Sequence, residues 1–262
     1  MTATNRYVAI IERIFRSKYK RGSQEIQFDR SELVKAANEL KISLPKNLGD
    51  VLYSFRYRTS LPRSITKTAK KGKEWIIRPA GRSKYKFALV PKVSISPNPT
   101  LSVTKVPDAT PRIVVRYGMS DEQSLLAQVR YNRLVDIFTG IACYSLQNHL
   151  RTSVPSIGQI EIDELYVGVD MRGRQYVFPV QAKGGNDSLS VVQIEQDISC
   201  CQYKFPDLIC KPIAAQFLRN GDIALFELEC CEGAIRIREE KHYRLVESDD
   251  LSREELRAYN FG

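Results

Sequence analysis

The chain has 262 residues, of which 43% are hydrophobic, a share typical of globular proteins that bury one large core or two modest ones. It has no apolar run of eighteen residues, no basic N-terminal segment before an apolar stretch and no C-x2-C zinc pairs, so we expect a cytoplasmic protein with no membrane partner and reduced cysteines. The formal net charge of +10 is uneven, because residues 1–95 hold 22 Lys and Arg against 7 Asp and Glu while residues 96–262 hold 18 against 23, so a polyanion is expected to contact mainly the first part.

The N-terminal elements follow helical and then alternating spacing of apolar residues. They are predicted, in order, as helices over 4–17, 31–40 and from Pro45 to about Arg56, a polar basic hairpin tip over 65–73, and strands around Trp75 and over Tyr85–Leu89. Three helices followed by a basic two-stranded ribbon is the order of a winged helix. Residues 1–92 are therefore predicted to form a winged helix-turn-helix-like domain.

In a winged helix the third helix enters the major groove and the wing lies on the DNA backbone. Double-stranded DNA is therefore the expected partner. The residues predicted to face DNA are Lys46, Arg56, Arg58 and Arg63, and those predicted on phosphates are Lys67, Lys70, Lys71 and Lys73. The alternative is a small α/β domain with ordinary surface lysines.

A segment rich in Pro and Ser over residues 93–112 is predicted to be a linker, which leaves residues 113–262 as a second domain. In that domain Ser120 and Gln123 form a capping-box pattern that opens a long helix to about Leu150. The further predicted elements are strands over 159–169 and 174–183, a helix over 188–203, and strands over 208–217, 223–230 and 233–238. This order predicts an α/β domain with a central sheet.

The first two strands are joined by a three-residue loop that ends in Gly173, which would pair Asp170 with Arg174. Counted back along this hairpin, Asp163 falls opposite Gln181 and Glu161 falls opposite Lys183. Because cross-strand partners share a face, the four side chains are predicted to form one patch. Two carboxylates, an amide oxygen and an ammonium in one place suit Mg²⁺, which prefers oxygen ligands.

An aspartate on one strand followed by Gln181-Ala182-Lys183 on the next resembles the motif of the PD-(D/E)XK nuclease superfamily. The resemblance implies a central mixed sheet flanked by helices and a Mg²⁺ cofactor held by Asp163, Gln181 and the carbonyl of Ala182. It implies that Lys183 orients the attacking water or stabilises the charge on the phosphate, and it makes Glu122 the candidate helical glutamate. The chain departs from the pattern because Gln181 replaces an acidic residue and no proline precedes Asp163.

The resemblance implies a Mg²⁺-dependent DNA endonuclease, of which a type II restriction endonuclease acting as a homodimer is the first expectation. The alternatives are a DNA-binding regulator that does not cut, and a repair or recombination nuclease without fixed sequence preference. At the residue level, Asp163 and Lys183 could instead form a surface ion pair, and Glu122 could complement the helix dipole. Gln193, Gln196 and Asp197 are expected on a solvated helix face rather than in the site.

Overall fold

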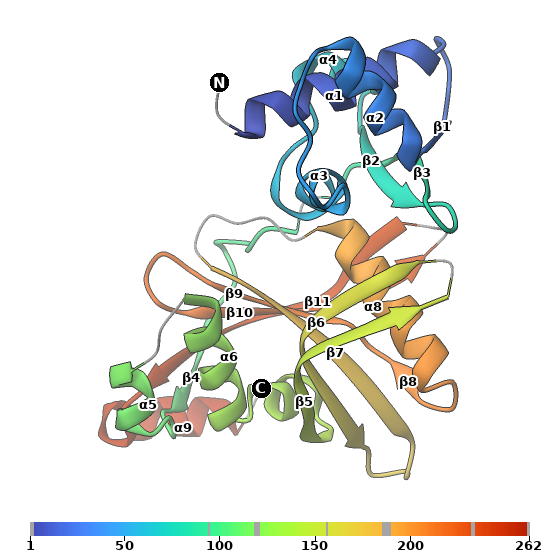
Figure 1. The fold of residues 1–262 in the computed structure, drawn as a ribbon. Coiled ribbons are helices and arrows are strands. Elements are labelled where there is room, and N and C mark those ends of the chain that lie inside the picture. The colour runs from blue at the N-terminus through green and yellow to red at the C-terminus, as the bar shows by residue number, and fades with distance from the viewer. Residues whose placement is uncertain are drawn as a thin grey trace. The chain divides into compact units, whose positions relative to one another are not determined.

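The structure is a computed structural model that describes residues 3–93, 95–117, 121–155, 157–184, 190–231 and 234–260. It is a mixed α/β protein that divides into two compact units (Figure 1). Unit 1 comprises residues 1–94, 152–160 and 190–196, and unit 2 comprises residues 95–151, 161–189 and 197–262. These borders differ from the expected division at residues 92 and 113, because two later segments group with unit 1.

Unit 1 combines short helices with a small antiparallel sheet of order β1-β3-β2. Its elements are α1 (Ala3–Lys18), β1 (Glu25–Asp29), α2 (Arg30–Glu39), α3 (Gly49–Tyr53), the π-helical turn η1 (Ser54–Arg58), α4 (Arg63–Thr66), β2 (Lys73–Pro79) and β3 (Lys84–Pro91). The first two predicted helices are confirmed, whereas β1 was not predicted. Only Ile26 and Phe28 of that five-residue strand are buried, which is too short an alternation to stand out in the sequence.

The core of unit 1 is built around aromatic rings. Phe15 of α1 lies edge-on to Trp75 of β2 and to Phe87 of β3, with ring centroids 5.2 and 5.1 Å apart. Such edge-to-face contacts add to the free energy gained by burying the rings. The helices and the hairpin are thus held together by one apolar cluster.

The predicted hairpin tip over residues 65–73 is wrong. Residues 63–66 form α4, anchored by the fully buried Ile65, and the turn between β2 and β3 lies at residues 80–83. Gly81 and Ser83 have φ angles of +120° and +59°, and this left-handed geometry is what a tight turn requires of its residues. The basic run at 67–73 therefore connects α4 to β2.

Unit 2 contains a mixed sheet of order β4-β11-β10-β9-β7-β6-β5, with β8 beside β7. Its elements are β4 (Val103–Pro107), α5 (Arg112–Tyr117), α6 (Asp121–Tyr131), α7 (Leu134–Thr139), β5 (Ala142–Val154), β6 (Gly158–Val169), β7 (Gln175–Lys183), α8 (Val191–Lys204), β8 (Ile209–Cys210), β9 (Ile213–Phe217), β10 (Ile223–Cys231), β11 (Ala234–Val246), the 3-10 turn η2 (Ser248–Asp250) and α9 (Arg253–Tyr259). The ends of β5, β6 and α8 at residues 152–160 and 190–196 are grouped with unit 1. The predicted α/β class is confirmed.

The single long helix predicted from Ser120 to Leu150 is wrong. α6 and α7 are separated by Arg133 in a left-handed conformation, and α7 ends at Gly140, which is also left-handed with φ +65°. Residues 142–154 then form β5. Ser120, the predicted helix cap, lies outside the described residues.

Part of the predicted linker belongs to the sheet. Residues 103–107 form β4, which pairs in parallel with β11 from His242 to Val246. Val106 is buried in the main core, and Pro107 ends the strand at the edge of the sheet, where the missing N–H of proline is tolerated. A Pro- and Ser-rich composition thus conceals a short edge strand.

Helices α6 and α8 flank the sheet of unit 2 (Figure 1). Leu125 and Val129 of α6 pack in one apolar cluster with Val180 of β7. Residues that alternate along a strand point to opposite faces, so Gln181 lies on the side of α8. Within the described part of the chain, no helix is both long enough and apolar enough to cross a membrane.

Candidate functional site

The hairpin of β6 and β7 has the predicted register. Glu164 pairs with Val180 and Val169 pairs with Gln175, while the N–H of Asp170 donates to the carbonyl of Arg174 at 3.1 Å. Gly173 adopts φ +77°, as expected of a glycine that closes a three-residue loop. The register prediction is therefore confirmed, and Asp163 and Gln181 occupy the next positions along it.

Beyond the Glu164–Val180 pair, side chains take over from the main chain in joining the described parts of β6 and β7. The N–H of Ala182 donates to Oδ2 of Asp163 at 2.9 Å, and Nε2 of Gln181 donates to the carbonyl of Glu161 at 3.3 Å. In the same stretch β7 pairs in parallel with β9, with Ala182 opposite Ala215. We call this region the fork (Asp163, Gln181, Ala182 and Lys183), because the two strands separate there and leave polar side chains between them.

Gln181 and Asp197 form a buried pair on the α8 side of the fork. Both residues are fully buried, and Nε2 of Gln181 donates to Oδ2 of Asp197 at 2.8 Å. Oδ1 of Asp197 is buried with no hydrogen-bond partner among the described residues. Burial raises the pKa of Asp197 well above its usual value, against the hydrogen bond from Gln181, and the nearby Asp163 raises it further.

The expectation that Gln193, Gln196 and Asp197 lie on a solvated helix face is therefore wrong for Asp197 and for Gln196. Gln196 is also buried, and Gln193 is half-buried. Sequence reasoning favoured a solvated face because polar residues at these positions are mostly exposed. The available signal was a polar residue inside the helix that follows the second strand of the hairpin, and this signal does not reveal which face of the helix is buried.

Lys183 lies at the last position of β7 and reaches the first turn of α6. Its Nζ is 3.4 Å from Oε1 of Glu122, with 17% of the lysine side chain and 42% of the glutamate side chain exposed. This ion pair brings together two residues that are 61 positions apart in the sequence, and both belong to the predicted set of site residues. Among the described residues Lys183 has no ion pair with Asp163, so the alternative of a surface Asp163–Lys183 bridge is wrong.

The carboxyl group of Asp163 lies in a mixed environment. Burial raises its pKa, while the hydrogen bond from Ala182 and the charge of Lys183 lower it, and Glu122 raises it. The net shift is upward, so the negative form of Asp163 lacks full compensation by the surrounding protein. A cation beside Asp163 would stabilise that form.

Glu161 does not join the fork through its carboxylate. Its Oε1 is 3.1 Å from Nη2 of Arg151 on β5, and about a third of the side chain is exposed. Only its main-chain carbonyl contacts Gln181. The predicted four-residue patch is thus reduced, because Glu161 pairs with Arg151 while Lys183 pairs with Glu122.

His149 of β5 is a neighbour of the site that the sequence did not indicate. Its Nε2 is 2.6 Å from Nε2 of Gln123, the residue after Glu122, and its charge lowers the pKa of Asp163. The backbone of His149 is left-handed, with φ +48°, a conformation that is uncommon outside glycine. Because this stretch was predicted as helix, no pattern could have placed the imidazole here.

The fork offers oxygen donors but no cluster of acidic and imidazole ligands among the described residues. No group of three or more His, Cys, Asp or Glu within the described ranges is placed to hold a metal ion. The Asp163 carboxylate, the Gln181 amide and the Ala182 carbonyl nevertheless offer only oxygen, the donor that Mg²⁺ takes together with several waters. Near the fork, Oδ1 of the buried Asp197 also lacks a hydrogen-bond partner among the described residues, and the three oxygen donors fit the group in chemistry.

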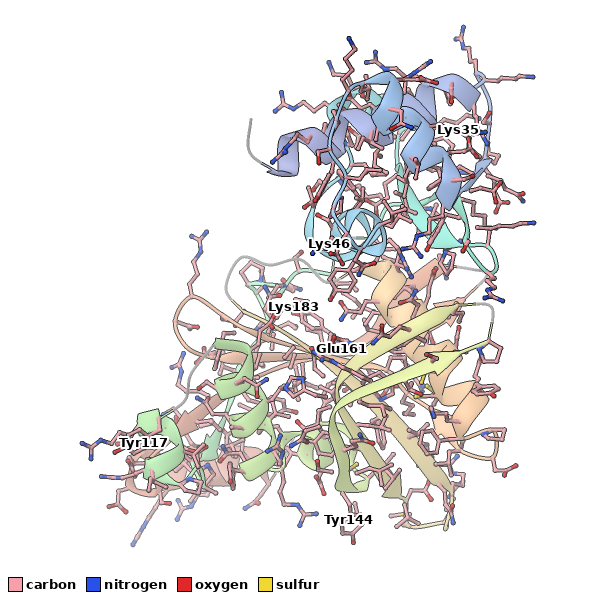
Figure 2. The ribbon with its side chains drawn as sticks, viewed as in Figure 1. Lys35, Lys46, Tyr117, Tyr144, Glu161 and Lys183 are labelled. Atoms are coloured by element: carbon pink, nitrogen blue, oxygen red, sulfur yellow. The ribbon has the colours of Figure 1, made fainter. Side chains whose placement is uncertain are left out.

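The basic residues predicted to face DNA all belong to unit 1. Lys46, Arg63, Lys67, Lys70, Lys71 and Lys73 are exposed, Arg56 is half-buried, and the side chain of Arg58 lies outside the described residues. Lys46 precedes α3, Arg63 begins α4, and the lysines at 67–73 lie between α4 and the start of β2. Figure 2 shows Lys46 beside α3.

The six exposed residues predicted to contact DNA differ from other basic residues of unit 1, some of which form ion pairs. Lys18 pairs with Glu32 at 2.7 Å, and Lys86 pairs with Glu25 at 2.5 Å. No ion pair occurs for the six exposed predicted residues within the described part of unit 1. Two further exposed basic residues are Arg82, in the turn between β2 and β3, and Lys84, at the start of β3. Neither was predicted to face DNA, because the turn was expected at residues 65–73.

Comparison with known proteins gives no match, whether to protein-family models, to curated proteins or to solved structures.

Proposed function

We propose that this chain is a Mg²⁺-dependent DNA endonuclease, in which unit 2 hydrolyses the phosphodiester bond and unit 1 binds double-stranded DNA. The observation that carries the proposal is the fork, where the N–H of Ala182 donates to Asp163 and the amide of Gln181 donates to the carbonyl of Glu161 between two separating strands. The Lys183–Glu122 ion pair connects this fork to α6. Burying an amide and a carboxylate beside a lysine at the end of a sheet costs free energy unless the groups are compensated, and a bound cation would supply part of that compensation.

The roles follow from the chemistry of each side chain. Asp163, the Gln181 amide oxygen and the Ala182 carbonyl would hold Mg²⁺, which when bound polarises the phosphate and lowers the pKa of a water. Lys183 orients the attacking water and stabilises negative charge that develops on the phosphate oxygens, while Glu122 holds the ammonium in place. The water oxygen bonds to phosphorus as the bond to the leaving oxygen breaks.

The order of elements supports the resemblance to the PD-(D/E)XK superfamily. A helix carrying Glu122 precedes the hairpin, Asp163 lies on its first arm, Gln181-Ala182-Lys183 ends its second arm, and α8 follows. In unit 1 the helices, the β2–β3 hairpin and the exposed lysines support a winged-helix-like DNA-binding role. A type II restriction endonuclease that acts as a homodimer remains our first proposal within this class.

The test is cleavage of a plasmid by the full-length protein. Mg²⁺-dependent cutting is expected, with loss of cutting in EDTA and a fall of about 10²–10³-fold in the rate of Lys183→Ala, since Lys183 stabilises charge in the transition state. Lys105→Ala is the matched control, because Lys105 is also ion-paired, with Glu255 at 2.6 Å, but lies on β4. Cutting by Lys183→Ala at the wild-type rate would contradict the proposal.

The second candidate is a DNA-binding regulator whose nuclease-like unit does not cut. It is favoured by Gln181, which carries no negative charge and whose amide is hydrogen-bonded to Asp197. DNA binding without cleavage at any Mg²⁺ or Mn²⁺ concentration would support this candidate. If cutting occurs, discrete fragments from a long DNA indicate restriction, whereas a smear indicates a repair or recombination nuclease.

A further inference from the structure

The side-chain amide of Gln181 has a fixed orientation. Its two N–H bonds are directed to Oδ2 of Asp197 and to the carbonyl of Glu161, at 2.8 and 3.3 Å. Rotating the amide by half a turn would place Oε1 against the carbonyl oxygen of Glu161, which accepts hydrogen bonds and cannot donate one. Oε1 therefore points away from Asp197 and from the Glu161 carbonyl.

We propose that Asp197 is a positioning residue that holds Gln181 with its oxygen turned toward a divalent cation. We further propose that the acid and the amide can be exchanged between positions 197 and 181, because each position requires the other to carry the complementary group. The use of that oxygen as a ligand rests on the proposed function, whereas the pairing itself rests on contacts between described residues. Asp197 lies 16 residues beyond Gln181, on α8. Its role is indirect, because the reacting atoms are contacted by the residues it orients.

The pair also explains why an amide stands where the resembling motif has an acid. A glutamate at position 181 would place its carboxylate at hydrogen-bond distance from the carboxylate of Asp197, with both groups fully buried. Two carboxylates at that distance in a buried site cannot both be ionised. An acid at 197 therefore requires a neutral donor at 181, and an acid at 181 requires a neutral donor at 197.

The exchange is tested by urea unfolding of Gln181→Glu, Asp197→Asn and the double variant in the full-length chain at pH 8. Gln181→Glu alone is expected to lower the urea midpoint clearly, Asp197→Asn alone to change it little, and the double variant to recover most of the loss. Independent residues would give additive effects instead, and additivity overturns the pairing. Asp222→Asn is the control second change, since Asp222 is equally buried but pairs with Arg244, and it should not rescue Gln181→Glu.

The positioning role is tested by calorimetric Mg²⁺ binding. Asp197→Ala is expected to weaken Mg²⁺ affinity about 10-fold or more, the usual effect of removing a group that orients a metal ligand. Asp222→Ala should bind Mg²⁺ as the wild type does, and Gln181→Glu/Asp197→Asn at least as tightly. Unchanged affinity in Asp197→Ala overturns the role.

The coupling between Gln181 and Asp197 and the role of Gln181 in Mg²⁺ binding can be disproved separately. A wild-type protein that neither binds Mg²⁺ nor cuts DNA would overturn both the proposed function and the positioning role. The urea measurements would still decide whether Gln181 and Asp197 form a coupled pair. If Gln181→Glu does not fold while the double variant does, the coupling is supported.

Discussion

Asp170 illustrates how one carboxylate can fix the geometry of a hairpin. Its oxygens accept hydrogen bonds from the main-chain N–H groups of Arg172 and Arg174, from Nε of Arg174 and from the hydroxyl of Tyr176. Burial raises the pKa of Asp170, but these hydrogen bonds outweigh it and bring the pKa to about 2. The charged form is therefore part of the folded turn that sets the register of Asp163 and Gln181.

Replacing Asp170 with Asn should make the free energy of unfolding less dependent on pH in the acid range. Because the folded pKa lies below the value of ~3.9 for an unfolded aspartate, the contribution of Asp170 is fully present above pH 4 and is lost as pH falls toward 2. Urea unfolding at pH 6 and pH 3 is expected to show a destabilised variant whose difference from wild type shrinks at pH 3. Asp249→Asn, at an exposed position, is the control; a difference that stays constant with pH would count against this role.

The site could be predicted only where short-range rules fix it. The turn chemistry at Gly173 set the register, so Asp163 and Gln181 could be placed opposite each other from sequence. Asp197 and His149 could not be placed, since their positions depend on which helix face α8 presents and on a strand that has no alternating pattern. Glu122 was proposed because a helical acid before the hairpin belongs to the resemblance.

At the scale of elements, β5 shows why a strand can escape detection. Residues 144–149 are all exposed, so this stretch lacks the alternation of buried and exposed side chains that marks a half-buried strand. The helical spacing of Leu125, Leu126 and Val129 lies just before this stretch. Because no strand pattern followed, the predicted helix was continued through it. Gly140 ended the helix in the structure, as a glycine in left-handed geometry commonly does.

The close approach of β5 and β6 depends on Gly168. A Cβ at this position would lie 2.9 Å from Cγ2 of Ile141, 3.0 Å from the carbonyl oxygen of Ala142 and 3.1 Å from Sγ of Cys143. Gly168→Ala is therefore expected to destabilise the fold by about 1–3 kcal/mol, the typical effect of overpacking. Denaturant unfolding measures it, with Val169→Ala at the exposed neighbouring position as control; equal stabilities would refute the close approach.

At the scale of the whole molecule, the charge distribution was readable from sequence but the division into units was not. The excess of Lys and Arg falls in residues 1–95, and residues 1–94 make up most of unit 1. The segments 152–160 and 190–196 belong to the same unit, and no local composition marks them. The borders of the units depend on contacts between residues that are distant in the sequence. The net charge of a segment, by contrast, can be counted directly from its residues.

DNA binding by unit 1 should respond to salt through its exposed lysines. Replacing Lys67, Lys70, Lys71 and Lys73 with Gln is expected to weaken binding to all DNA sequences and to reduce the slope of log K against log salt by about 0.9 for each phosphate that is no longer neutralised. Fluorescence anisotropy at several salt concentrations measures the slope. Lys18→Gln/Lys86→Gln is the matched control, because these lysines are ion-paired; the same slope in both variants would assign DNA binding elsewhere.

The parallel pairing of β4 with β11 has a consequence for biogenesis. Val103 lies opposite His242, so about 140 residues must leave the ribosome before this edge of the sheet can close. Until then β10 has no neighbour on that side, and an uncovered strand edge is prone to pair with other chains. Nascent protein is therefore most exposed to aggregation just before its last strand is synthesised, and slowing translation ahead of residue 234 should lower the yield of native protein.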